Sequence, residues 1–164
     1  MNAEATFEYA IRSATLSDAP ALGLLFAAHL QALGVTPEAR LDADMADYMA
    51  VYHGGANGFL VAENDTVGVV AMGGVADGAI RRLHVAGKWR GHGIARALVM
   101  RLIALHYSVS YQPLTALVAG WNVAARRLFL SCGFQPTDQF PQDPNTRGCE
   151  ILSIDESCPP LRCV

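Results

Sequence analysis

A glycine-rich turn between a strand-like run and an amphipathic helix pattern constrains this chain more than any other feature. The run Ala79–Val85 has the composition of a strand, and the turn Arg90–Gly93 follows it after a short connection. Apolar residues then recur at helical spacing, at Ile94, Leu98, Leu102 and Leu105. The order strand, turn, helix favours a sheet covered by helices over an all-helical or all-β architecture.

The start of this predicted helix is a candidate anion site. Backbone N–H groups in the first turn of a helix lack an acceptor within the helix and carry partial positive charge, so they suit phosphate oxygens. Gly91 and Gly93 have no Cβ to keep a ligand from the backbone, and Arg90 adds a full charge. The turn is no P-loop, because Gly-Lys-Ser/Thr is missing. It is no Rossmann fingerprint either, because Arg96 stands where that pattern needs a third small residue.

The remaining patterns alternate between strands and helices. Strands are expected at 7–14, 58–62, 66–75, 114–118 and 149–154, and helices at about 18–33, 41–52 and 122–131. The short segment Glu63–Asp65 between two strands indicates a hairpin. We therefore expect one α/β domain over residues 1–164, with a mixed, largely antiparallel sheet flanked by helices.

Composition narrows the class of function. Hydrophobic residues make up 52% of the 164 residues and charged residues only 16%, which favours a packed core over disorder. The formal charge of −3 provides no basic surface for nucleic acid, and no polybasic segment argues for a membrane surface. The expected location is cytoplasmic. No metal is expected, because Cys132, Cys149, Cys158 and Cys163 lack the spacing of zinc ligands and suit reduced thiols.

The segment from Leu83 to Phe134 resembles the GNAT superfamily of N-acetyltransferases. Arg90, Gly93 and Ala95 match the family's acetyl-CoA signature, Arg/Gln-x-x-Gly-x-Gly/Ala, and Leu83 and Val85 give the usual Leu-x-Val upstream. A second matching block follows at Asn122, Ala125, Leu128, Gly133 and Phe134. The resemblance implies a GNAT-like fold, with acetyl-CoA as cosubstrate and direct transfer of its acetyl group to a primary amine.

The resemblance also implies roles for individual residues. Backbone groups of Leu83 and Val85 would hold the pantetheine arm, and the Val85 N–H would stabilise the oxyanion of the tetrahedral intermediate. Asn122 would form a hydrogen bond near the pantetheine. The pyrophosphate would lie on the backbone amides of Arg90, Gly91, His92, Gly93, Ile94 and Ala95.

Three positions depart from the family pattern. Phe129 stands where many members have a Tyr that protonates the leaving thiolate, and Ala79 and Leu117 stand where a carboxylate base would lie. Two interpretations stay open. One is an enzyme that relies on positioning and oxyanion stabilisation, with water relaying protons. The other is a non-catalytic acyl-CoA-binding module of the same fold.

His84 is the nearest imidazole in the sequence and is a candidate general base. Strand alternation places it on the face opposite Leu83 and Val85, which favours a structural or surface role unless a bulge reverses the alternation. Cys132 is a weaker candidate nucleophile, because no histidine stands at triad spacing and direct transfer needs no acyl-enzyme.

The acceptor side has little diagnostic sequence. The family normally builds it from the first two helices, here about Asp18–His53, and from the late loop, here Gln135–Arg147 with its prolines. A small amine or an amino acid is the first choice of acceptor, and a protein N-terminus or lysine is the second. A homodimer through exposed sheet edges is a further open alternative.

Overall fold

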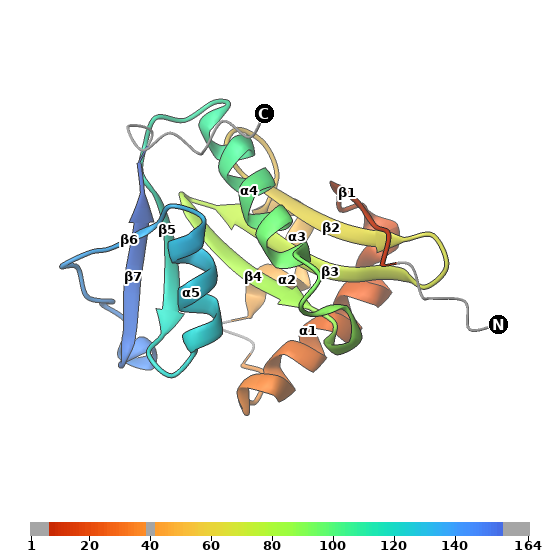
Figure 1. The fold of residues 1–164 in the computed structure, drawn as a ribbon, viewed down its shortest axis with the longest axis horizontal. Coiled ribbons are helices and arrows are strands. Elements are labelled where there is room, and N and C mark those ends of the chain that lie inside the picture. Colours follow the sequence, from red (N-terminus) through yellow and green to blue (C-terminus); the bar gives the residue numbers. More distant parts are fainter. Residues whose placement is uncertain (1–6, 39–41, 156–164) are drawn as a thin grey trace.

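The structure is a computed structural model that describes residues 7–38 and 42–155. A seven-stranded sheet in the order β1-β2-β3-β4-β5-β7-β6 forms its centre (Figure 1). The strands are β1 Ala10–Ser13, β2 Gly58–Asn64, β3 Gly68–Ala76, β4 Ala79–Val85, β5 Leu114–Ala119, β6 Gln135–Pro136 and β7 Cys149–Ile154. Neighbouring strands are antiparallel except β4 and β5, which are parallel. The expected mixed, largely antiparallel sheet is confirmed.

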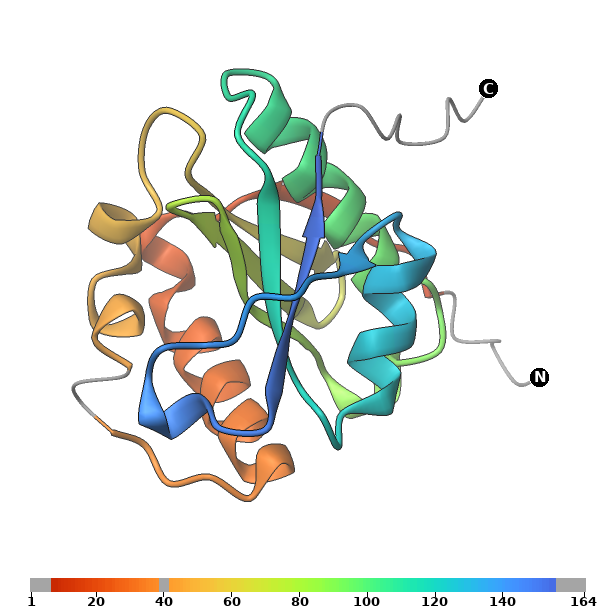
Figure 2. The same ribbon diagram turned by 90° about the vertical axis from the view of Figure 1, so that its left-hand side faces the viewer.

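Helices cover both faces of this sheet. The α-helices are α1 Ala19–Leu33, α2 Ala43–Ala46, α3 Tyr48–Val51, α4 Ile94–Tyr107 and α5 Val123–Ser131. Short 3-10 turns lie at Leu16–Asp18, Gly87–Trp89 and Pro144–Thr146. Figure 2 shows the sheet nearly edge-on, with α1, α2 and α3 on one side and α4 and α5 on the other. We call these two sides the α1 face and the α4 face.

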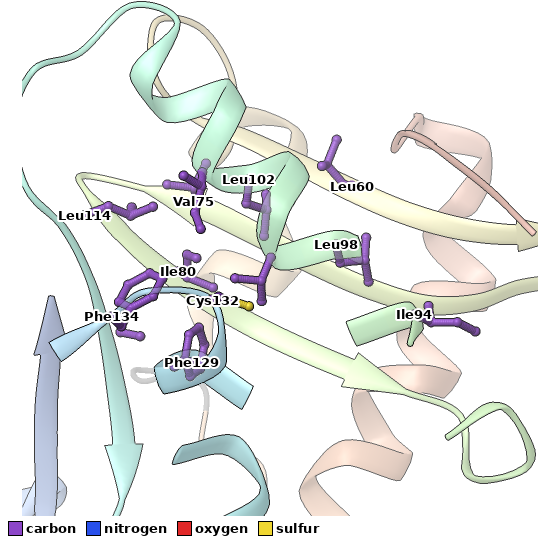
Figure 3. Close-up of a cluster of buried hydrophobic side chains, with 14 of the residues drawn as sticks. Leu60, Val75, Ile80, Ile94, Leu98, Leu102, Leu114, Phe129, Cys132 and Phe134 are labelled. Atoms are coloured by element: carbon purple, nitrogen blue, oxygen red, sulfur yellow. The ribbon is translucent and has the colours of Figure 1, made fainter. Parts of the chain in front are cut away.

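The α4 face has an apolar core. Leu98 and Leu102 of α4 are fully buried, and they pack in one cluster with residues of β2, β3 and β4 (Figure 3). From α5, Phe129 meets Phe134 edge-on, with 5.1 Å between ring centroids. Burying a Leu or Phe side chain stabilises the fold by about 1.5–3 kcal/mol, so this cluster fixes α4 and α5 to the sheet.

The α1 face combines apolar packing with buried charge. Two nitrogens of Arg12 donate to the two carboxylate oxygens of the buried Asp18, both at 2.8 Å, and a third donates to Glu63 at 2.7 Å. The hydrogen bond from Arg12 is the main reason that the pKa of Asp18 falls to about 2. Farther along the same face, Arg82 forms ion pairs with Asp42 at 2.9 Å and Asp44 at 2.6 Å.

Several boundaries differ from those predicted. The helix expected over 41–52 is two short helices, because Asp47 leaves the helical conformation (φ −138, ψ 58) and its side chain caps α3. The hairpin is confirmed, but β2 extends to Asn64, so its turn lies later than expected. A two-residue strand, β6, lies in the proline-rich region expected to be a loop. Pro136 is tolerated there because β6 is at the sheet edge.

Where the two strands pair, β4 contains one more residue than β3. Met72 pairs with His84 and Gly74 with Arg81, so Gly73 alone lies opposite Arg82 and the residue after it. Arg82 adopts a left-handed backbone with φ +58. This β-bulge shifts the alternation of side chains within the strand.

The segment Leu16–Leu33 is long and apolar enough to cross a membrane by length and composition alone. It contains α1, which packs against β3 and β4 and buries Leu22, Leu25 and Leu30. One such helix is weak evidence for a membrane protein. The cytoplasmic location stays a prediction.

Candidate active site

A cavity lies where β4 and β5 part. The two strands pair only at Ala79 with Thr115 and at Ile80 with Ala116. Beyond these pairs a cavity of about 530 Å³ is lined by β4, the glycine turn, both helices of the α4 face, and α1. It brings together every predicted cofactor residue except His92, namely Leu83, Val85, Arg90, Gly91, Gly93, Ile94, Ala95 and Asn122.

The glycine turn presents bare backbone to this cavity. Gly91 and Gly93 have φ +82 and +78, which only glycine adopts without strain, and a Cβ at either position would point into open space. The first hydrogen bond of the helix runs from Ala97 N to Gly93 O at 3.0 Å. Among the described residues, the amides from Gly91 to Arg96 therefore have no backbone acceptor. The local geometry is that of an anion cradle.

Val85 directs its backbone N–H into the gap between β4 and β5. Ala86 N donates to Val70 O at 2.9 Å, so Ala86 faces β3. Because backbone groups alternate in an antiparallel ladder, the N–H and C=O of Val85 point away from β3. Arg90 Nε donates to that carbonyl oxygen at 3.0 Å, which ties the turn to the strand. The Val85 N–H therefore points toward the cavity without a partner on β3. Its role as an oxyanion donor stays a prediction.

His84 also lines the cavity, although it lies on the α1 face as alternation predicts. Its Nδ1 is 3.3 Å from Nδ1 of His29, which comes from α1. His84 is buried, so a surface position is excluded, and the choice between a structural and a catalytic role stays a prediction. The cavity is lined from both faces of the sheet, by Ile94 on the α4 face and by Leu33 on the α1 face.

Burial disfavours the charged form of both imidazoles. Burial lowers the pKa of His84 to about 4, with further contributions from His29 and the Arg90 charge. Burial is also the main reason that the pKa of His29 is lowered, with Arg82 and Arg90 adding to it and Asp42 opposing it. In a neutral pair joined through Nδ1, one ring donates and the other accepts.

Asn122 has a structural task besides lining the cavity. It is the N-cap of α5, and its Oδ1 accepts a hydrogen bond from Ala125 N at 3.1 Å. The predicted hydrogen bond near a pantetheine arm stays a prediction. With Oδ1 engaged at the cap, the Nδ2 group is the part of Asn122 that suits a ligand acceptor.

The side chain of His92 lies outside the cavity lining. Its ring stacks on Phe7 with centroids 3.5 Å apart, and Phe7 contacts Trp89 edge-on at 5.2 Å. The predicted contribution of His92 through its backbone N–H stays a prediction. Trp89 and Trp121 both line the cavity, Trp121 with 64% of its surface exposed.

The positions that depart from the family pattern do not line this cavity. Phe129 is buried in the α4-face core, and Leu117 is exposed on β5. Cys132 is buried, and burial raises the pKa of its thiol, which does not suit a nucleophile. Cys158 and Cys163 lie outside the described residues.

The sequence predicted the acceptor side only at the level of segments, and that prediction is not tested by the cavity lining. Within the predicted range Asp18–His53, α1 contributes His29, Ala32 and Leu33. No residue of the late loop Gln135–Arg147 lines this cavity, and its part in an acceptor wall stays a prediction. His29 could have been found as the one imidazole on the helix stripe that also carries Leu22 and Leu33.

Comparison with known proteins identifies the class. The fold is similar to that of a GNAT-family acetyltransferase from Staphylococcus aureus, with a TM-score of 0.77, 13% identity, and coverage of 90% of this chain and 99% of that one. It is also similar to a phosphinothricin acetyltransferase from Sinorhizobium meliloti solved with acetyl-CoA. There the TM-score is 0.68, with 15% identity over 90% of this chain and 88% of that one. These neighbours define an acetyltransferase fold.

The sequence matches the acetyltransferase (GNAT) family over residues 26–134, and the chain belongs to this family. It is 34% identical over 108 residues to N-acetyltransferase 8F1 of Rattus norvegicus, which covers 60% of this chain. The chain spans about half the length of that relative, 49%. The resemblance drawn from the glycine turn is confirmed.

Proposed function

We propose that this chain binds acetyl-CoA and transfers its acetyl group to a primary amine by direct attack of the amine on the thioester. The observation that carries the proposal is that the anion cradle and the free Val85 N–H share one cavity between parting strands. The Sinorhizobium meliloti protein of the same fold is solved with acetyl-CoA, which supports this cosubstrate.

The lining residues fit such a cosubstrate. Arg90 and Arg96 are the full charges of the cavity wall, and no Asp or Glu of the described residues lines it, so nothing there repels a pyrophosphate. The amides of the turn would bind the phosphates, and backbone groups of Leu83 and Val85 would bind the pantetheine arm. When bound, acetyl-CoA supplies the activated acetyl group.

Positioning supplies most of the proposed rate enhancement. Holding the two reactants in line contributes about 7–11 kcal/mol to lowering the barrier. The Val85 N–H, directed into the gap, is placed to donate to the oxyanion that forms at the thioester carbon. Because an amine must lose its proton before it attacks, activity is expected to rise with pH.

The acceptor is proposed to be a small amine or an amino acid. The α1 side of the cavity offers His29, Ala32 and Leu33, and no carboxylate of the described residues is there to pair with a second ammonium group. This favours an acceptor with one amine over a polyamine or a lysine-rich peptide. A faster release of CoA with spermidine than with neutral or acidic amino acids would contradict this choice.

A non-catalytic acyl-CoA-binding module is the second candidate. It is favoured by the absence of the family's usual acid and base, since Ala79, Leu117 and Phe129 occupy those positions. Binding of acetyl-CoA without release of CoA in the presence of many amines would support it.

The extent of the domain and its location are parts of the same proposal. Strands β1 and β7 lie outside the family match, yet both pair into the one sheet, which supports a single acetyltransferase domain over residues 1–164. We retain a cytoplasmic location, with no nucleic-acid or membrane partner, and a homodimer as predictions.

The first experiment is calorimetric titration with acetyl-CoA, combined with an assay of CoA release on mixed amines. Gly93→Asp puts a carboxylate into the cradle at φ +78, and is expected to weaken binding at least about 100-fold. Gly68→Asp is the matched control, because Gly68 also has a positive φ (+81) and open space but lies in the β2–β3 hairpin. Failure of the wild-type chain to bind acetyl-CoA would refute the proposal.

A further inference from the structure

We propose that His29 and His84 act together as one proton-transfer pair in acetyl transfer, replacing the acid and the base that the family pattern lacks here. The inference rests on the proposed function and assigns the proton steps of that same site. It starts from a geometric fact. Two imidazoles from distant elements, α1 and β4, lie 3.3 Å apart at Nδ1 in the wall of the cavity.

The hydrogen bond between the rings fixes how they face the cavity. The ring that donates from Nδ1 keeps a bare Nε2, and the ring that accepts at Nδ1 carries its proton on Nε2. Among the described residues, Nε2 of neither ring has a hydrogen-bond partner. Neither Nε2 is among the buried polar atoms that lack a partner, so both are accessible. The pair therefore offers one proton acceptor and one proton donor at the same time.

These two functions match the two proton movements of the reaction. The bare Nε2 takes a proton from the acceptor ammonium, which leaves a free amine to attack the thioester carbon. As the new C–N bond forms and the C–S bond breaks, the other Nε2–H donates its proton to the departing thiolate. A proton moving across the Nδ1···Nδ1 bond leaves the pair neutral with its two tautomers exchanged, and exchange of the Nε2 protons with water returns each ring to its starting form. The proton still on the amide nitrogen also leaves to water. The sum is amide, thiol and one released proton.

The surrounding charges link this pair to cofactor binding. The groups that act on the two rings are Arg82 of β4 and Arg90 of the turn, which disfavour the imidazolium forms, and Asp42, which favours that of His29. Arg90 also lies in the proposed pyrophosphate site. A bound pyrophosphate would offset the Arg90 charge and make both rings more basic when the cosubstrate is in place.

The test uses the full chain and three asparagine variants. Asn keeps a polar group near the position of Nδ1 but cannot carry a proton between two nitrogens, so His29→Asn and His84→Asn retain much of the contact and lose the relay. His53→Asn is the matched control, because His53 is exposed and outside the cavity. Each protein is titrated with acetyl-CoA, assayed for CoA release from pH 6 to 9, and followed by NMR of its imidazole nitrogens.

We expect both cavity variants to bind acetyl-CoA within about threefold of wild type and to lose about 100-fold in kcat/KM, with a changed pH profile. In wild-type spectra, the pKa values of His29 and His84 should lie below the ordinary value of a histidine and rise when CoA is added. Variants that bind acetyl-CoA and keep kcat/KM within about threefold across the pH range would overturn the pair while leaving the proposed function intact. Wild-type protein that binds acetyl-CoA but releases no CoA with any amine would overturn both.

Discussion

The two faces of the sheet are stabilised by different kinds of interaction. The α4 face buries aliphatic and aromatic side chains and offers the ligand mostly backbone, through the amides after Gly91 and the N–H of Val85. The α1 face has an apolar cluster too, but it also holds the ion pairs of Arg12 and Arg82. The α4 face, which would bind the common cosubstrate, offers backbone groups that every residue type has. The α1 face, which would meet the acceptor, presents individual polar side chains.

This difference indicates which part of the site can change its substrate specificity by substitution. Backbone donors are the same for every residue type, so a site made of them depends on turn geometry and tolerates change around it. A site made of charged and imidazole side chains changes with every substitution. The following predictions test whether the two faces respond differently to mutation and to pH.

The largest effect is expected on the α4 face. Leu98→Ala removes a fully buried side chain and should lower the free energy of unfolding by about 4 kcal/mol. Because only apolar contacts are lost, the decrease should be the same at pH 7 and pH 5 in urea denaturation. Val67→Ala, at a side chain with 60% exposure, should change stability by less than about 0.5 kcal/mol. If the loss of unfolding free energy in Leu98→Ala depended on pH, the two faces would not differ in the kind of interaction that stabilises them.

The next effect is expected at Arg82, whose removal leaves two carboxylates without their cation. Arg82→Leu should cost about 3 kcal/mol near pH 7. Burial alone would raise the pKa of Asp44, but hydrogen bonds from Arg82 and Tyr52 bring it below its ordinary value. The ion pair of Arg82 and Asp44 therefore contributes fully to stability at pH values above the ordinary pKa of an Asp. Its contribution disappears as the pH falls through the lowered pKa of Asp44.

The measurement for Arg82→Leu is urea denaturation over a series of pH values. The difference from wild type should shrink in acid, as Asp44 becomes protonated. Arg81→Leu is the control, since Arg81 is exposed and adjacent in sequence. An equal loss in both variants would mean that the ion pairs are not the cause.

Asp18 should show a smaller and sharper dependence on pH. Its pKa is lowered to about 2, so it contributes about 2 kcal/mol that is present above pH 4 and lost between about pH 4 and pH 2. Asp18→Asn should remove this contribution, so that the melting temperature falls less between about pH 4 and pH 2 than in the wild type. Asp138→Asn, at an exposed position, should leave this fall unchanged. The same fall in Asp18→Asn as in the wild type would show that other groups cause the acid sensitivity.

The smallest effect is expected from restoring the family's tyrosine. In Phe129→Tyr the new hydroxyl would lie in the apolar core beside Phe134, so stability should fall by about 1 kcal/mol. CoA release should not increase, because this ring does not line the cavity. A clear gain in kcat with Tyr would show that the side chain reaches the site and would contradict the position of α5.

The α4 face could be predicted from the sequence because its signals are local. A glycine pair before a helical stripe determines the turn, the helix and the anion cradle, and Ala79–Val85 and Cys149–Ile154 were predicted with the bounds that the structure shows. Each of these elements follows from residues within one short window. The prediction for His92 concerned its backbone amide and stays a prediction, while its ring stacks on Phe7.

The α1 face could not be predicted in the same way because its contacts are distant in sequence. His29 and His84 are 55 residues apart, and Arg82 and Asp44 are 38 apart. The break of the second helix depends on the cap at Asp47, and the β-bulge depends on the pairing with β3. A single sequence indicates which residues are polar but not which of them meet.

The bulge at Arg82 has a consequence for how this strand can change in length. Ile80, Leu83 and Val85 all belong to the α4-face core, a spacing that a regular strand would not allow, and Arg82 is the surplus residue. A deletion of that one codon would restore a regular strand and leave Leu83, His84 and Val85 on their present faces. A deletion anywhere between Leu83 and Val85 would instead move the cavity residues out of phase. Natural length variation in β4 should therefore be confined to this position.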